Sequence, residues 1–120
     1  MFLCDNITIK IHAGGDFVKK IIYDVMEKLK PFVEADPNIN KIILFGSHAK
    51  GKAQLGSDVD LAFICDDPGS VNRGLLRYAT SDFYTKLDFV YTTDDWLNSA
   101  KKWSDVNYWI REEGIVLWQR

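Results

Sequence analysis

The stretch Ile42-Ile43-Leu44-Phe45-Gly46-Ser47, followed after ten residues by Asp58-Val59-Asp60-Leu61-Ala62-Phe63-Ile64, decides the fold of this chain. Short continuous apolar runs bounded by glycine and polar residues are typical of buried strands. The stretch therefore predicts a strand, then a turn that can cradle a phosphate, then a second strand that begins with two carboxylates.

Asp58 and Asp60 are expected on one face of the second strand, because successive side chains of a strand point to opposite faces. Val59 and Leu61 then face the core. Carboxylates this close repel each other and raise each other's pKa, so the pair is stable when a cation lies between them. Mg²⁺ prefers oxygen ligands, which makes the pair a candidate metal site. A solvated strand start would also explain Asp58 and Asp60 taken alone.

Asp88 interrupts the apolar run Leu87-Asp88-Phe89-Val90-Tyr91, which predicts a third strand. A carboxylate on a neighbouring strand would complete a site for two metal ions. A lone aspartate in such a run is more often a solvated edge residue. Asp88 is therefore a candidate metal ligand only in combination with Asp58 and Asp60.

Gly46-Ser47 follows a strand and precedes an expected helix start. Glycine lets the backbone approach a ligand closely, and a helix N-terminus favours phosphate. The Ser47 hydroxyl can bond a phosphate oxygen. Gly-Ser is also a common turn, so this pair has meaning only together with the carboxylates that follow it.

The rest of the chain predicts helices packed on a small sheet. The other expected elements are an edge strand over 7–11, a helix from an Asp16 N-cap to Pro31 or Ala35, a short helix from Ser47, a helix over 71–84, a short helix capped by Asp94 or Asp95, a helix over 105–113 ended by Gly114 as a C′ residue, and a last strand or docked tail over 115–118. This order indicates an α/β (α+β) fold, a small mixed sheet with helices packed against it, in a single domain over 1–120.

The composition excludes several classes of protein. Hydrophobic residues are 47% and charged residues 27%, which is ordinary for a globular domain. The net charge is -2, so there is no basic footprint for gripping a long nucleic acid. Two cysteines without metal spacing suit a reduced compartment, and no segment approaches the roughly 20 apolar residues of a membrane span. We therefore expect a soluble, cytoplasmic protein.

Four tryptophans gather in the last quarter of the chain: Trp96, Trp103, Trp109 and Trp118. Aromatic residues are enriched at interfaces, but their helical spacing favours core packing for most of them, with one left exposed. For His48, inside the decisive stretch, a solvated or structural role is favoured over contact with phosphate.

Written out, Gly46-Ser47-His48-Ala49-Lys50-Gly51 and Ser57-Asp58-Val59-Asp60-Leu61 resemble the signature of the DNA polymerase β-type nucleotidyltransferase superfamily. More narrowly, the chain resembles the minimal nucleotidyltransferases, short prokaryotic proteins often encoded beside a HEPN-domain partner. The third strand and the tail over 111–117 look similar too, so the resemblance spans Lys41 to the end.

The resemblance implies a role for each signature residue. Asp58 and Asp60 would hold two Mg²⁺ ions, and Asp88 would complete the metal set and assist deprotonation of the attacking hydroxyl. Gly46, Ser47, Lys50 and Ser57 would bind the nucleoside triphosphate, expected to be ATP. The family commonly has Arg where this chain has Lys50, and Lys lacks the bidentate fork for phosphate.

The resemblance also implies an acceptor outside the chain. Antibiotic-modifying relatives usually carry an extra helical domain, whereas relatives paired with HEPN toxins act as antitoxins, some by transferring AMP to the toxin. An adenylyltransferase that modifies a HEPN partner is therefore the leading expectation. A catalytically weak module that masks its partner, and a nucleotidyltransferase for a small molecule such as an antibiotic, are the alternatives.

Overall fold

Four strands in the order β3-β2-β1-β4 form one mixed sheet in the computed structural model, which describes residues 15–54 and 56–120. The strands are β1 (Ile39–Phe45), β2 (Val59–Cys65), β3 (Leu87–Thr92) and β4 (Ile115–Gln119). β1 pairs antiparallel with β2 and β4, whereas β2 and β3 are parallel. The expectation of a small mixed sheet is confirmed.

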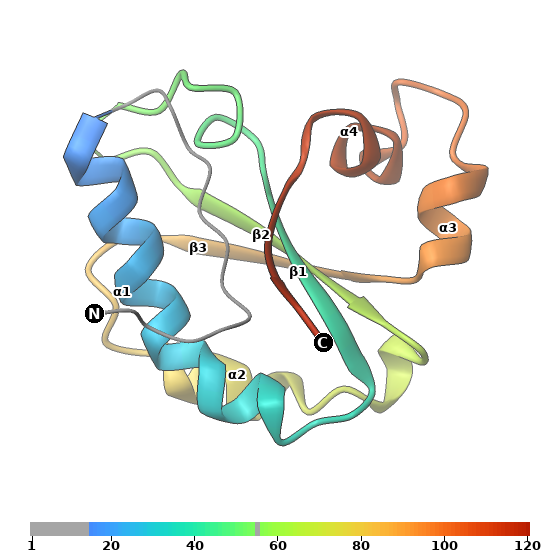
Figure 1. The fold of residues 1–120 in the computed structure, drawn as a ribbon, viewed down its shortest axis with the longest axis horizontal. Helices are drawn as coiled ribbons and strands as arrows, with labels where there is room; N and C mark the ends of the chain where they lie inside the picture. Colours follow the sequence, from blue (N-terminus) through green and yellow to red (C-terminus); the bar gives the residue numbers. More distant parts are fainter. Residues whose placement is uncertain (1–14, 55) are drawn as a thin grey trace.

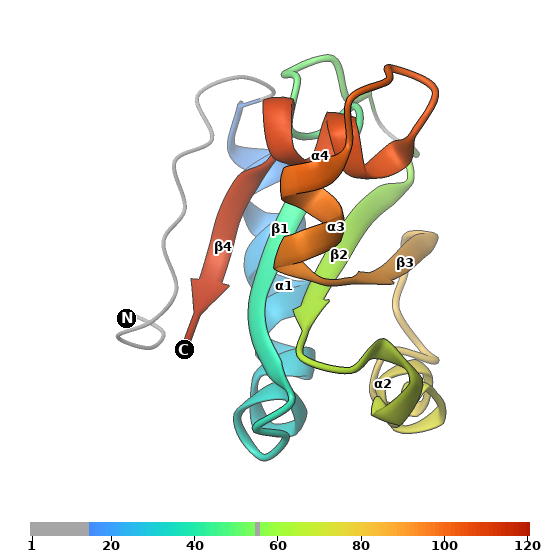
Figure 2. The ribbon, with the colours of Figure 1, turned by 90° about the vertical axis from the view of Figure 1, so that its right-hand side faces the viewer.

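Helices cover both faces of this sheet. They are α1 (Gly15–Glu34), α2 (Arg73–Ala79), α3 (Asp94–Ser99) and α4 (Val106–Glu113), with a single 3₁₀ turn over Pro68–Ser70. α1 and α2 lie on one side of the strands and α3 and α4 on the other, as Figures 1 and 2 show from two directions.

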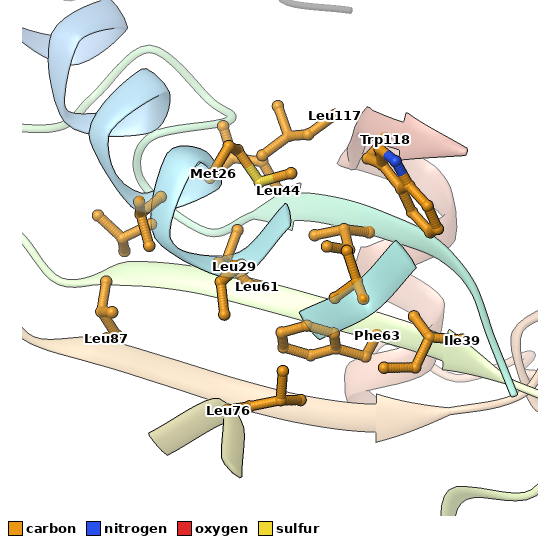
Figure 3. Packing of buried hydrophobic residues seen from close by; sticks show 14 of the residues in the cluster. Met26, Leu29, Ile39, Leu44, Leu61, Phe63, Leu76, Leu87, Leu117 and Trp118 are labelled. Atoms are coloured by element: carbon orange, nitrogen blue, oxygen red, sulfur yellow. The ribbon is translucent and has the colours of Figure 1, made fainter. Parts of the chain in front are cut away.

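The larger core lies between the sheet and α1 (Figure 3). The helix places apolar side chains on one stripe at helical spacing. Met26 and Leu29 on that stripe are fully buried against Leu44 and Leu61 of the central strands. Phe63 extends this core toward β3, where its ring stacks on Tyr91 and meets Phe89 edge to face.

A smaller core lies on the opposite face. Ile43, Ala62 and Ile64 alternate in sequence with the residues of the larger core and pack against Leu97 of α3 and Ile110 of α4. Because β1 and β2 are buried on both faces, their sequences are continuously apolar rather than alternating. By the same alternation, Asp60 shares the face covered by α3 and α4.

Several expected element boundaries are wrong. No helix starts at Ser47, where residues 47–51 form a turn. α2 ends at Ala79 instead of reaching Tyr84, because the Thr80 hydroxyl donates back to the Leu76 carbonyl and closes the last turn. The N-cap of α3 is Thr93, not Asp94 or Asp95.

Three further expectations concern the helix ends and the first strand. α1 begins at Gly15, so Asp16 lies inside the helix and is not its N-cap. Gly114 ends α4 with φ −72°, outside the left-handed region that defines the expected C′ glycine. The expected strand over 7–11 lies outside the described residues.

The tryptophans are less buried than their spacing suggested. Trp118 of β4 is only 1% exposed, whereas Trp96, Trp103 and Trp109 are 53%, 74% and 38% exposed. The helical face that would have buried Trp96 and Trp103 together does not form, because α3 ends at Ser99. Across 15–54 and 56–120, no helix is both long enough and apolar enough to cross a membrane.

Candidate active site

Asp60 and Asp88 face each other across the parallel pair of strands. The β2–β3 register pairs Asp60 with Asp88, one residue after the pair Val59 and Leu87. Their carboxylates lie within hydrogen-bonding range of each other. The structure therefore brings together two of the three carboxylates that the sequence had marked, from positions 28 residues apart in the chain.

The environment of Asp60 opposes its ionisation. Burial of the half-buried side chain, followed by the negative charges of Asp88 and Asp58, raises the pKa of Asp60 to about 6, while Lys86 pulls in the opposite direction. Two carboxylates in contact cannot both ionise comfortably without a positive charge between them. A hard divalent cation such as Mg²⁺ prefers oxygen ligands and would relieve the repulsion between the two carboxylates, so this pair suits such a cation.

Gly46 backs directly onto Asp60. Its φ of 75° is in the left-handed region, and a Cβ at this position would collide with the Asp60 carboxylate. The turn that follows is closed by two backbone hydrogen bonds, in which the amides of Lys50 and Lys52 donate to the carbonyls of Gly46 and Ser47. Glycine is therefore required here for both conformation and space, and the turn lies directly beside the carboxylate pair.

Asp58 is turned toward a different partner. Its Oδ2 lies 3.6 Å from Lys86 Nζ, in a partly exposed ion pair. Within the described residues, no three His, Cys, Asp or Glu side chains converge closely enough to hold a metal ion. Asp60 and Asp88 fit such a cation as they stand, whereas Asp58 would have to exchange Lys86 for it.

Lys50 is engaged with α4. Its Nζ lies 3.3 Å from Glu113 Oε1 and 5.5 Å from the centre of the Trp109 ring. The Lys50 head is half-exposed, but Glu113 Oε1 is buried and has no hydrogen bond, so separating the pair would leave that carboxylate oxygen unpaired. Lys50 is thus close to the end of the turn but is held by the C-terminal helix.

Ser57 and His48 stabilise the loop between the turn and β2. The Gln54 amide donates to Ser57 Oγ at 2.8 Å, and the Ser57 amide donates to the Gln54 carbonyl at 2.9 Å. His48 is 1% exposed, with its Nε2 3.4 Å from the Ser57 carbonyl. His48 is thus buried and not solvated, which supports the structural alternative, and the Ser57 hydroxyl accepts a hydrogen bond within the loop.

Two charged residues beside the site did not emerge from the sequence. Lys86 lies two positions before Asp88, so the alternation of a strand could have placed it on the same side. Glu113 is 63 residues from Lys50 and carries no local signal. Both were missed because a contact between distant segments is set by the whole fold.

The glycine turn after β1 lies beside two carboxylates that face each other on the parallel strands β2 and β3. This arrangement is typical of a nucleotidyltransferase fold. The chain belongs to the family described as Polymerase beta, Nucleotidyltransferase, which matches residues 27–120. No curated protein matches the sequence significantly.

Solved structures share this fold. One is a candidate nucleotidyltransferase from Sulfolobus solfataricus, 20% identical, with 88% of this chain and 90% of that chain covered and a TM-score of 0.53. Another is described as a toxin–antitoxin with AMP-PNP, 23% identical, covering 85% and 73%, with a TM-score of 0.54. A third, the MntA–HepT toxin–antitoxin, is 21% identical, covering 85% and 73%, with a TM-score of 0.51. These likenesses confirm the nucleotidyltransferase fold that the sequence signature predicted.

Proposed function

We propose that this chain transfers AMP from ATP to a hydroxyl group on a HEPN-domain partner, and that it acts in this way as an antitoxin. The observation that carries the proposal is the Asp60–Asp88 pair beside the Gly46 turn. Family membership supports nucleotide transfer in general, and the relative described with AMP-PNP supports an adenine nucleotide.

In this proposal, Asp60 and Asp88 would hold Mg²⁺, and Asp58 would be free to join them only if it gave up its ion pair with Lys86. Bound Mg²⁺ would supply charge neutralisation for the attacking and leaving oxygens. The backbone of Gly46 and the hydroxyl of Ser47 bind the triphosphate. Because transfer of this kind depends on positioning and electrostatics, the chain needs few other acid–base groups.

The transfer itself exchanges one ester bond for another. The acceptor oxygen forms a bond to the α-phosphorus while the bond from that phosphorus to the β-bridging oxygen breaks, and pyrophosphate leaves with the electron pair. The proton of the acceptor hydroxyl passes to the Asp88 carboxylate and from there to solvent.

A HEPN partner is proposed because two of the structural relatives are described as toxin–antitoxin pairs. The test is incubation of the protein with α-labelled ATP, Mg²⁺ and the product of the neighbouring gene. We expect label on the partner with wild type and none with Asp58→Ala/Asp60→Ala. Asp95→Asn, on the exposed first turn of α3, is the matched control and should retain transfer. Absence of label with wild type, while the two proteins bind, would refute the enzymatic proposal.

A second candidate function is neutralisation of the partner by masking alone. It is favoured by two ion pairs that occupy expected site residues, Lys50 with Glu113 and Asp58 with Lys86. Protection of cells separates the two functions. If Asp58→Ala/Asp60→Ala protects as well as wild type, masking is sufficient, and if protection is lost while the complex persists, chemistry is required.

A further inference from the structure

A pocket of about 420 Å³ opens at the free edge of β3, between the end of α2 and the start of the strand. Among the described residues, β3 is the outermost strand on this side of the sheet, and no other described strand pairs with that edge. Asp88, Arg77, Ser81, Phe83 and Lys86 are among the residues that line the pocket. Asp88, the register partner of Asp60, is therefore part of the pocket lining.

The strand order places this pocket opposite the glycine turn. The turn follows β1, Asp60 lies on β2, Asp88 lies on β3, and the pocket lies beyond β3. Turn, carboxylate pair and pocket thus follow one another across the sheet. An in-line displacement needs the attacking and leaving oxygens on opposite sides of the phosphorus. With the departing phosphates at the turn, the attacking hydroxyl belongs on the side of the pocket.

The charges of the lining define the acceptor further. Arg77 donates from Nη1 to the Leu87 carbonyl at 3.1 Å and lies 4.4 Å from the centre of the Phe89 ring, and both of these partners are uncharged. Within the described part of the chain, no carboxylate forms an ion pair with Arg77. Asp82, in the loop between α2 and β3, is paired instead with Lys28 of α1 at 3.1 Å.

Lys86 adds a second positive charge to the lining, and its side chain is 69% exposed. Its present partner, Asp58, is the carboxylate that would turn to Mg²⁺ in the proposed function. The pocket would then present two cations to whatever enters it. Such a lining favours an anionic ligand, and Arg is the residue best suited to carboxylate or phosphate.

We propose that this pocket is the acceptor subsite and that it selects a hydroxyl carried close to a carboxylate or phosphate. The inference rests on the proposed function, since it names the acceptor class for the same transfer. Arg77 binds the anionic group, and the hydroxyl lies next to Asp88, which accepts its proton as the oxygen bonds to the α-phosphorus and pyrophosphate departs. An acidic peptide and a sugar phosphate share this chemistry.

The test follows backbone amide shifts by NMR, in protein saturated with Mg²⁺ and a non-hydrolysable ATP analogue. Two pairs of probes are titrated, the peptide Glu-Tyr-Glu against Lys-Tyr-Lys, and ribose 5-phosphate against ribose. We expect an anionic probe to shift the amides of Ser81, Phe83 and Thr85 saturably, with at least tenfold tighter binding than its partner. Binding of Glu-Tyr-Glu would indicate a protein acceptor, and binding of ribose 5-phosphate would indicate a small-molecule acceptor.

Three variants assign the effect to the pocket. Ser81→Trp fills the space from an exposed position and should abolish the shifts. Arg77→Gln retains a donor for the Leu87 carbonyl but loses the charge, and should weaken the anionic probe at least tenfold, whereas Arg77→Lys should restore most of the binding. Far-ultraviolet circular dichroism confirms that each variant is folded.

The inference would be overturned by the absence of shifts at these amides with both anionic probes, or by equal binding of charged and uncharged probes. Shifts that persist in Ser81→Trp would also overturn it. The amides of Gly46 and Ser47 report the proposed function separately. If they do not respond to Mg²⁺ and the ATP analogue, nucleotide binding fails, whatever the probes do at the pocket.

Discussion

At the scale of single residues, the site depends on two close approaches around Asp60. Asp88 contacts its carboxylate from the neighbouring strand, and Gly46 leaves the space that the carboxylate fills. Both approaches are unfavourable in isolation, one through like charge and the other through backbone conformation. Such unfavourable placements are concentrated at functional sites in proteins, which supports the proposal that Asp60 belongs to one.

The raised pKa of Asp60 predicts a pH dependence of stability in metal-free protein. Its pKa is about 6 in the folded chain, against an ordinary value of 3.8 for an aspartate. Because the folded state holds the proton more tightly, this contribution to the free energy of unfolding is fully present below pH 3.8 and is lost as pH rises through about 6. We expect Asp60→Asn, which cannot ionise, to gain stability relative to wild type between pH 5 and 7.5.

Urea unfolding in EDTA at several pH values measures this difference. The quantity of interest is the free energy of unfolding of the variant minus that of wild type, so that other titrating groups cancel. A difference that stays constant from pH 5 to 7.5 would contradict the raised pKa.

The glycine turn allows a matched pair of substitutions. Gly46 and Gly56 both have positive φ, but a Cβ at Gly56 would meet nothing within 4 Å. Gly56→Ala therefore costs only the backbone term, about 1–2 kcal/mol. Gly46→Ala should cost more in chemical denaturation, because it also displaces the Asp60 carboxylate. Equal losses in the two variants would show that the close approach of Gly46 to Asp60 contributes nothing.

At the scale of elements, the parallel pairing of β2 and β3 aligns the carboxylates. The register that buries Val59 and Leu87 also sets Asp60 opposite Asp88. A slip of one residue would turn the side chains of a strand to the wrong face. The packing of the core therefore fixes the geometry of the site.

Much of this arrangement could be predicted from local sequence. The apolar runs of β1 and β2 depend only on neighbours in the chain, whereas β2 begins at Val59, so the expectation that Asp58 opens the strand is wrong by one residue. The Lys50–Glu113 pair and the exposure of Trp103 could not be predicted, because they depend on how distant helices meet the sheet. The site residues themselves remain predictions, to be tested by substitution.

The capping of α3 is a prediction at this scale. Thr93 Oγ1 accepts a hydrogen bond from the Trp96 amide at 3.0 Å, whereas the sequence had suggested Asp94 or Asp95 as the cap. Thr93→Ala should therefore destabilise the protein by about 1 kcal/mol. Asp95→Asn, which loses only a charge in the first turn, should cost about 0.3–0.5 kcal/mol. Chemical denaturation of both variants tests the assignment, and a larger loss in Asp95→Asn would reverse it.

At the scale of the whole molecule, one sheet separates two unequal cores. α1 seals the larger core, and α3 with α4 covers the smaller one on the face that carries Asp60. Figure 2 shows this layering with α3 and α4 in front of the strands and α1 behind them. The larger core lies on the side of α1, while Asp60 lies on the face with the smaller core.

Substitution of a buried and an exposed tryptophan tests which of them contributes to the packing of the core. Trp118 is 1% exposed, in contact with the larger core, so Trp118→Ala should cost about 3–5 kcal/mol. Trp103 is 74% exposed, and the Trp109 Nε1–H donates a hydrogen bond to its backbone carbonyl, so the Trp103 side chain takes no part in that bond. Trp103→Ala should therefore change stability by no more than about 0.5 kcal/mol. Thermal unfolding compares the two, and similar losses would contradict the assigned burial.

The central claim is that the carboxylates beside the glycine turn bind the metal ion used for nucleotide transfer. Paramagnetic broadening of backbone amides by substoichiometric Mn²⁺, recorded by NMR with a non-hydrolysable ATP analogue, tests it most directly. We predict that signals of Gly46, Ser47, Asp60 and Asp88 broaden first and that Asp60→Asn removes the effect. Broadening centred instead on another carboxylate group, such as Asp66 and Asp94 at the opposite end of β2, would contradict the account.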